Sequence, residues 1–360
     1  METLAWIGVA QSLFAAIIIL TKRQRSISDQ LLSSWLFLLA VEYFTCAIDY
    51  IVYSKPLLSS SFLLFNPALY LYVKSLTRES FKLKWVQLLH LLPFVFFEIT
   101  TYLISEKTIL SAFFIIDSTH WFRMAFAAIN IISWFLYNTQ SIIIVHRHRK
   151  SLENEFSSIE KNKKLGWVLF IVIYYNVYCF IAVLIGITAI FYQTNPVLPH
   201  IYNYATLLIL VYILGFYGLM QEIIYKKHEP EIREEETTAQ PMLSESKTKE
   251  IKNRLLDYFN REKPYLDPEF NMATLSAKLL IPKHHLTQVL NAEIGKNFFR
   301  FVNEYRVEEV KKQIIIKKHY SMEAIGFECG FNSKSAFFSV FKNFTGLTPL
   351  QYKNTLKENT

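Results

Sequence analysis

The sequence predicts an all-α protein, in which a seven-helix transmembrane bundle precedes a soluble domain of shorter helices. Long apolar stretches fill the first 220 residues, a hydrophilic stretch follows, and helical periodicity resumes near residue 248. Hydrophobic residues make up 52% of the 360-residue chain and charged residues only 19%, which is too apolar for an ordinary soluble protein. We therefore expect a membrane part at residues 1–220, a cytoplasmic linker at 221–247 and the soluble domain at 248–360.

Seven stretches approach the length that a membrane-spanning helix needs, which is about 20 mostly apolar residues. The third of them is interrupted by Asn66 and Pro67, a combination that transmembrane helices tolerate. We place the seven spans at residues 4–20, 31–53, 57–76, 85–104, 121–145, 165–192 and 200–220.

The loops between these spans alternate in positive charge, and Lys and Arg concentrate in loops that stay in the cytoplasm. The other loops hold little beyond Lys55 and Lys107. No basic region precedes the first apolar run, so a cleavable signal peptide is not predicted. An odd number of spans with this bias puts the N-terminus outside and everything after Met220 in the cytoplasm. The basic loops contain Lys22, Arg23 and Arg25, then Arg78, Lys82 and Lys84, then Arg147, Arg149, Lys150, Lys161, Lys163 and Lys164, then Lys226 and Lys227.

Ionisable residues inside membrane spans are energetically costly, and they raise a functional hypothesis by default. Two hypotheses remain open for them. They line an outward-facing pocket for a polar signal ligand, or they pair with one another and hold the bundle together. Asn66, Asn130 and Asn176 are expected to form hydrogen bonds between helices. The candidate signal-sensing residues are Glu42, Asp49, Glu98 and Arg123.

The sequence contains none of the patterns that indicate a metal site, a disulfide framework or a catalytic centre. Its three cysteines, Cys46, Cys179 and Cys329, lie far apart and have no His or Cys at ligand spacing. There is no Gly-rich phosphate loop and no nucleophile motif. We therefore expect neither a cofactor nor an enzymatic activity.

Two short predicted helices after residue 270 are joined by a tight turn, as in a helix-turn-helix unit. Asn271 can cap the first of them, and Pro282 suits the first turn of the second, expected at residues 282–294. In such a unit the second helix enters the major groove of DNA. Its outward residues are donors and acceptors suited to base edges and phosphates, namely Lys283, His284, Thr287 and Gln288.

A second unit of the same kind follows after a longer helix at residues 297–316. Ser321 can cap its first helix, Gly330 breaks that helix, and the second recognition helix is expected at residues 333–344. At about 1.5 Å per residue the longer helix is close to 30 Å long. A rigid spacer of this length could place the two recognition helices about one DNA turn, near 34 Å, apart.

The stretch IGFECGFNSKSAFFSVFKNFTGLTPLQYK, residues 325–353, closely resembles the signature of AraC-type transcription regulators. Residues 271–307 fit the first helix-turn-helix of the same family, so the resemblance covers roughly the last third of the chain. Two positions depart from the pattern: Gly326 replaces the usual Ala, and Pro282 stands where a capping Ser is common. The positions that match are Gly330, Phe331, Phe337, Phe341, Lys342, Gly346, Pro349 and Tyr352.

The resemblance implies which residues contact DNA. In the first unit the family's base- and phosphate-contacting positions fall on His284, Thr287 and Gln288. The segments FNPALYLYVKSLT and FKLKWVQLLHLLPFVFF are also similar to the membrane half of AraC-type regulators from the Bacteroidetes group. In the second unit the DNA-contacting positions fall on Ser333, Lys334, Ser335, Phe338 and Ser339.

These features predict a membrane-embedded one-component transcription regulator of the bacterial inner membrane. Its expected partners are double-stranded DNA, the lipid bilayer, an unknown signal ligand and a second copy of the chain in a homodimer. The alternative is a membrane receptor or transporter whose basic C-terminal domain binds a different partner. A net charge of +8 is compatible with both hypotheses, because basic cytoplasmic loops and DNA-binding surfaces are both positive. The two complete recognition units favour the regulator.

Overall fold

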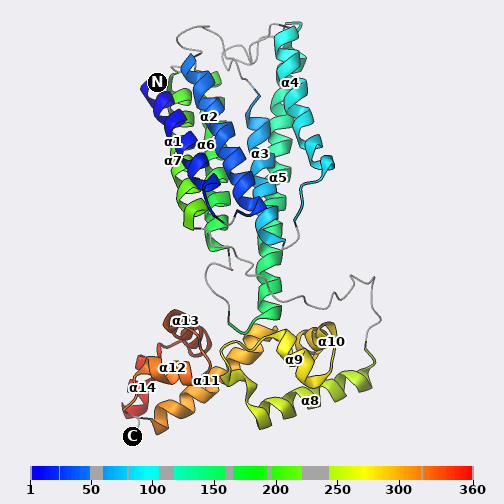
Figure 1. The fold of residues 1–360 in the computed structure, drawn as a ribbon, viewed down its shortest axis with the longest axis vertical. Helices are drawn as coiled ribbons and strands as arrows, with labels where there is room; N and C mark the ends of the chain where they lie inside the picture. Colours follow the sequence, from blue (N-terminus) through cyan, green and yellow to red (C-terminus); the bar gives the residue numbers. More distant parts are fainter. Residues whose placement is uncertain are drawn as a thin grey trace. The chain divides into compact units, whose positions relative to one another are not determined.

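The computed structural model describes residues 2–23, 25–48, 60–78, 81–104, 117–158, 165–192, 197–220, 243–317 and 319–358, and all regular structure in them is helical. Asp49, one of the candidate sensing residues, lies outside these ranges. The chain divides into two compact units (Figure 1). The first comprises residues 1–147 and 165–228, and the second comprises residues 148–164 and 229–360.

The first unit is a bundle of helices that follows the predicted spans. Six helices in the described residues are long and apolar enough to cross a membrane, counting η2 and α4 as one. Helix α1 packs against both α2 and α7. The helices are α1 (Glu2–Leu20), α2 (Ile27–Ile48), α3 (Phe62–Thr77), η2 (Trp85–Leu91) leading into α4 (Leu92–Leu103), α5 (His120–Glu155), α6 (Gly166–Tyr192) and α7 (Val197–Met220).

Helix α3 differs in length from the span predicted at residues 57–76. Its 16 residues extend for about 24 Å, which is short of the roughly 30 Å hydrocarbon core. It nevertheless belongs to the centre of the bundle, because Phe65, Asn66 and Val73 are all buried. Pro67 lies in its second turn, where it removes one hydrogen bond within the helix, a loss that apolar bundle helices tolerate.

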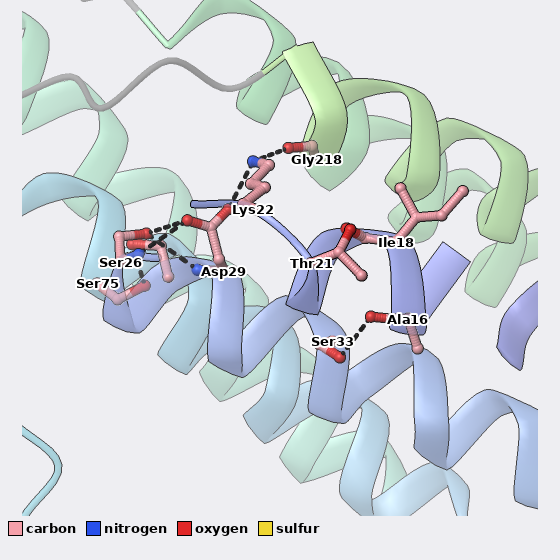
Figure 2. Close-up of polar contacts among 10 residues, drawn as sticks. Ala16, Ile18, Thr21, Lys22, Ser26, Asp29, Ser33, Ser75 and Gly218 are labelled. Carbon is pink, nitrogen blue, oxygen red and sulfur yellow. Dashed lines mark hydrogen bonds and ion pairs between the residues drawn. The ribbon is translucent and has the colours of Figure 1, made fainter. Parts of the chain in front are cut away.

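A polar cluster joins the end of α1, the start of α2 and the end of α7 (Figure 2). Lys22 Nζ lies 2.7 Å from Asp29 Oδ1 and also donates to the carbonyl of Gly218, in the last turn of α7. Ser26 and Asp29 bond each other's backbone N–H groups, at 3.1 and 2.9 Å, which forms a capping box at the start of α2. Ser75, near the end of α3, bonds Ser28 at 3.0 Å.

At the opposite end of the bundle, contacts join the start of α1, the end of α2 and the start of α7. The Tyr43 hydroxyl, toward the end of α2, donates to the carbonyl of Tyr204 near the start of α7 at 2.6 Å. Ala5 at the start of α1 and Cys46 at the end of α2 form a small core beside Tyr204. Helices α1 and α7 therefore run parallel. The helices from α1 to α7 therefore run the length of the bundle an odd number of times, and α3 must be counted among them.

A connected network of amides links α3, α5 and α6 inside the bundle. Asn138 on α5 donates to Asn66 Oδ1 at 3.3 Å and accepts from Asn176 Nδ2 at 3.0 Å. Tyr175 also donates to Asn66, at 3.1 Å. The prediction of interhelical hydrogen bonds is confirmed for Asn66 and Asn176. Asn130 differs, since its amide bonds the Phe126 carbonyl one turn earlier on α5.

The second unit contains seven α-helices in the described residues in addition to the end of α5. Helix α8 begins three residues before the periodicity expected from residue 248. The helices are α8 (Glu245–Glu262), α9 (Met272–Leu279), α10 (Lys283–Val289), α11 (Phe298–Ile316), α12 (Met322–Glu328), α13 (Lys334–Thr345) and α14 (Pro349–Glu358), with short turns η4 (Pro264–Leu266) and η5 (Leu290–Ile294).

Helix α11 takes part in both hydrophobic cores of this unit. Phe298, Phe301 and Val302 pack with α8, α9 and α10, whereas Val307 and Val310 pack with α12 and α13. The core residues predicted for α10 and α13, including Leu286 and Phe337, are buried as expected.

Between the two cores lies Arg306, whose side chain is fully buried. Its Nε donates to the carbonyl of Tyr265 at 2.7 Å, and its Nη2 donates to the carbonyl of Asp267 at 2.8 Å. The guanidinium carbon lies 5.8 Å from the centre of the Phe331 ring, in the turn between α12 and α13. Burial lowers the pKa of Arg306 to about 10, so the group stays charged at neutral pH.

We expect Asp29→Ala to lower the free energy of unfolding of the bundle by about 2–3 kcal/mol, because it leaves Lys22 without its carboxylate and removes the capping box. Thermal unfolding of the full chain in detergent measures the change. Arg25→Ala is the matched control, since Arg25 is exposed in the same loop. Equal melting temperatures for the two variants would contradict a stabilising role for the cluster.

Gly330→Ala should destabilise the second unit much more than Gly346→Ala, although both glycines have positive φ, at +88° and +77°. A Cβ on Gly346 would meet no atom within 4 Å. The loss in the free energy of unfolding for Gly346→Ala is therefore only the cost of a left-handed backbone for alanine, about 1–2 kcal/mol. A Cβ on Gly330 would lie 2.2 Å from the Tyr265 carbonyl oxygen, which raises the loss above about 3 kcal/mol. Urea unfolding of residues 243–360 tests this, and similar losses for both would refute the close approach.

Candidate nucleic-acid interface

The first helix-turn-helix unit consists of α9 and α10. Asn271 caps α9 as predicted, with Oδ1 accepting from the Thr274 N–H at 3.0 Å. Leu280 ends the helix in the left-handed conformation, and the Ser276 hydroxyl bonds the Ile281 carbonyl at 2.6 Å across the turn. Pro282 then precedes α10, and no side-chain cap bond forms there. The turn is therefore closed from α9 rather than by the residue at the start of α10.

Helix α10 presents the predicted DNA-contacting residues on the side away from its core. Leu286 and Val289 are fully buried, whereas His284 is exposed and Lys283, Thr287 and Gln288 are half-buried. The Thr287 hydroxyl donates to the Lys283 carbonyl at 2.9 Å, so it offers DNA only its acceptor lone pairs.

The second helix-turn-helix unit consists of α12 and α13. Ser321 caps α12 and Ser333 caps α13, each accepting a backbone N–H three residues later, at 3.1 and 3.2 Å. Gly326 replaces the Ala common in related sequences, and a Cβ there would lie 2.7 Å from the Phe337 ring. The glycine therefore lets the aromatic ring of α13 pack directly on the backbone of α12.

Helix α13 projects a polar edge that includes Lys334, Ser335 and Ser339, all exposed. The Lys334 ammonium forms an ion pair with Glu323 of α12 and lies 5.8 Å from the centre of the Phe338 ring. Sequence reasoning missed Glu323 because it lies on the preceding helix. Both partners are largely exposed, with side chains 63% and 44% accessible, so the pair contributes little stability and exchanges readily for a phosphate.

The nine predicted DNA-contacting residues thus fall on α10 and α13 and their caps. They differ in how exposed their side chains are and in whether their polar groups are already bonded within the protein. Ser333 uses its hydroxyl as a helix cap and Phe338 is half-buried beside Lys334. His285, next to His284, is half-buried, and burial lowers its pKa. The described residues contain no group of three potential ligands that could hold a metal ion.

Three of the four candidate signal-sensing residues are among the described residues. All three lie in the first unit, and their contacts differ. Glu42 on α2 is buried, and Glu98 on α4 accepts from the Ser60 N–H at 3.0 Å. Arg123 on α5 is buried and pairs with Asp117 at 2.9 Å. Hydrogen bonds from Thr119 and Arg123 lower the pKa of Asp117 to about 2. Asp117 was not singled out from the sequence, since it lies in a loop outside the predicted spans.

Residues 275–355 match a family model described as a helix-turn-helix domain, and this range covers both units. Over 76 residues the chain is 34% identical to an uncharacterized transcriptional regulatory protein, YesN, from Bacillus subtilis. Over 99 residues it is 29% identical to an uncharacterized HTH-type transcriptional regulator of the cgkA 5' region from Pseudoalteromonas carrageenovora. Over 85 residues it is 28% identical to the HTH-type transcriptional regulator GadX of Escherichia coli K12.

These similarities cover less than a third of this chain and at most about half of each relative. They cover 21%, 28% and 24% of this chain and 21%, 53% and 30% of the three relatives, respectively. A solved structure of a protein of unknown function from Listeria innocua is 26% identical over 29% of this chain and 96% of its own, with a TM-score of 0.27. Two capped helix-turn-helix units on a shared central helix, together with the family-model match and the similarity to transcription regulators, identify the C-terminal part of the chain as a helix-turn-helix domain of the AraC type.

Proposed function

We propose that this chain is a membrane-embedded one-component transcription regulator that binds specific DNA through its two helix-turn-helix units. The observation that carries the proposal is the presence, in one chain, of six helices able to span a membrane and a domain with two complete recognition units. The relatives named above carry the names of transcription regulators, which supports regulation rather than catalysis.

The surface of the first unit supports insertion into a bilayer. Large apolar side chains point outward along its helices, and such continuous apolar exposure is unfavourable in water. Phe14 on α1, Phe135 on α5 and Phe216 on α7 are each at least 60% exposed. Buried amides of this unit instead bond one another inside the bundle, as in the network of Asn66, Asn138 and Asn176.

The hydrogen bonds at the bundle ends support a cytoplasmic position for the DNA-binding domain. Lys22, in a loop predicted to be cytoplasmic, bonds the last turn of α7. The end of α7 therefore lies on the same side as that basic loop, and the chain that follows Met220 starts there. This agrees with seven passes and an N-terminus outside.

The second unit of the structure supports binding to consecutive turns of one duplex. The 19 residues of α11 extend for about 28 Å and connect the two recognition units without a break. Arg306 of α11 also bonds the turn that follows α8, and it lies beside Phe331, in the turn between α12 and α13. A spacer of this length is close to the rise of one DNA turn, about 34 Å.

The signal and the oligomeric state belong to the same proposal. We infer an unidentified polar ligand at the outer ends of the helices, where Arg123 and Asp117 lie, and a homodimer as the assembled form.

Chromatin immunoprecipitation of the intact protein tests the function as a whole. Enriched promoters support it, and recovery of no DNA above background would favour the receptor or transporter hypothesis.

The topology predicts opposite results for two reporter fusions. A cytoplasmic reporter fused after Met220 should be active, and a periplasmic reporter at the same point should be silent. Fusions between α6 and α7 should give the reverse. A periplasmic signal after Met220 would remove DNA from the partners of this chain.

Lys334→Ala should weaken binding of the full chain to a duplex recovered by immunoprecipitation by about three- to tenfold and reduce the salt dependence by about one ion, because one phosphate contact is lost. Fluorescence anisotropy at several salt concentrations measures both effects. Glu323→Gln is the matched variant. It releases the same lysine and should tighten binding, whereas Ser335→Ala should change sequence preference. Unchanged affinity and salt slope for Lys334→Ala would exclude α13 as a recognition helix.

A further inference from the structure

The end of α5 and the residues after it belong to the second unit, with which they make specific contacts. Residues 148–158 are grouped with the DNA-binding domain although they lie about 100 positions before it. Leu152 and Ser157 in this segment are buried, at 8% and 1% exposed. We call residues 148–158 the α5 segment.

Ser157 binds the buried guanidinium between the two recognition units. Its carbonyl oxygen accepts from Asn303 Nδ2 at 2.8 Å and from Arg306 Nη1 at 3.2 Å. Its hydroxyl oxygen accepts from Arg306 Nη2 at 3.1 Å and donates to the carbonyl of Phe270. One residue of the segment therefore satisfies three donors of α11 and an acceptor before α9.

Two further contacts place the segment at the starts of α11 and α9. Glu153 Oε2 accepts from the side-chain amide of Asn297, the cap of α11, at 2.9 Å. Phe156 forms an antiparallel bridge with Asn271, the cap of α9. Both caps are half-buried, whereas Ser321, which caps the corresponding helix of the second unit, is exposed.

The chemistry of these contacts resembles that of a DNA backbone. Helix starts, with their free N–H groups and amide side chains, are among the groups that bind phosphate oxygens in DNA-binding domains. The α5 segment presents a carboxylate to one such start and backbone to another. The starts of α9 and α11 come just before and just after α10, the first recognition helix, in the chain. A duplex bound along α10 would place its sugar-phosphate chain near these starts, where the α5 segment now lies.

We propose that the α5 segment is an internal inhibitor that competes with the DNA backbone for the starts of α9 and α11. This inference rests on the proposed function. Helix α5 is continuous from His120 to Glu155, so the segment that carries Glu153 is joined to the bundle by one unbroken helix. In the inhibited state the segment is bound, and in the active state it has left Asn271, Asn297 and Arg306.

A reversible cross-link tests the competition in the full chain. Bridge partners in an antiparallel pair have Cα atoms about 4.5–5.5 Å apart, which is within the range of a disulfide. The double variant Phe156→Cys with Asn271→Cys, in lipid nanodiscs, should form this cross-link. Oxidation should then weaken binding to a random-sequence duplex at low salt by at least about tenfold, and reduction should restore it. Because both states are measured on one sample, misfolding cannot produce the difference.

A second pair of variants tests release of the segment. Glu153→Ala removes the carboxylate from Asn297 and should tighten DNA binding several-fold, up to about tenfold. Glu155→Ala is the matched control, because it removes the same charge from an exposed position whose side chain bonds Ser151 on its own helix. It should change affinity less than twofold.

The outcomes separate the two proposals. Failure to form the cross-link, equal or tighter binding after oxidation, or equal effects of the two Glu variants would overturn the inhibitory role and leave DNA binding intact. Absence of salt-dependent binding in every variant, including Glu153→Ala, would overturn the proposed function itself.

Discussion

The buried guanidinium of Arg306 is the interaction on which the DNA-binding domain depends. A charged group out of contact with water is tolerated only when its hydrogen bonds are satisfied, and Arg306 donates to carbonyls from the turn after α8 and to Ser157. Loss of the Tyr265 or the Asp267 carbonyl as an acceptor leaves a buried donor without a partner. The group therefore makes the positions of several loops interdependent, and Gly330 must lack a side chain so that the Tyr265 carbonyl can approach.

The first unit follows a different constraint, which is that polar groups withdrawn from water need hydrogen-bond partners within the protein. Amides in the interior of the bundle and a charged cluster at one end bond one another in this way. The cluster also shows how α3 takes part in the bundle. Although α3 has only 16 residues, the contacts of Lys22 with Gly218 and of Ser75 with Ser28 require it to return the chain from one end of the bundle to the other.

Local features of the fold could be predicted from the sequence because their causes are local. Asn271 and Ser321 cap the helices for which they were proposed, since a cap depends only on the next three residues. The contacts of Ser157 with Arg306 join positions 149 residues apart, and neither residue type indicates the other. The same holds for Lys22 and Gly218. For Lys334, the exposed helix edge was predictable, but its ion pair with Glu323 depends on how α12 packs on α13. The DNA contacts themselves, the sensing residues and the domain boundaries stay predictions.

Asn138 of the amide network lies on the same helix, α5, as the first residues of the α5 segment. It bonds both Asn66 and Asn176, so polar contacts with few alternative partners inside the bundle set the position of this part of α5. Such contacts have discrete arrangements, whereas apolar surfaces slide more gradually. Under our proposal, a ligand that favours one arrangement would shift α5 by a defined step. Helix α5 continues without a break to Glu153, which bonds the cap of α11, and the energy available for switching would be bounded by the ligand's difference in affinity for the two arrangements.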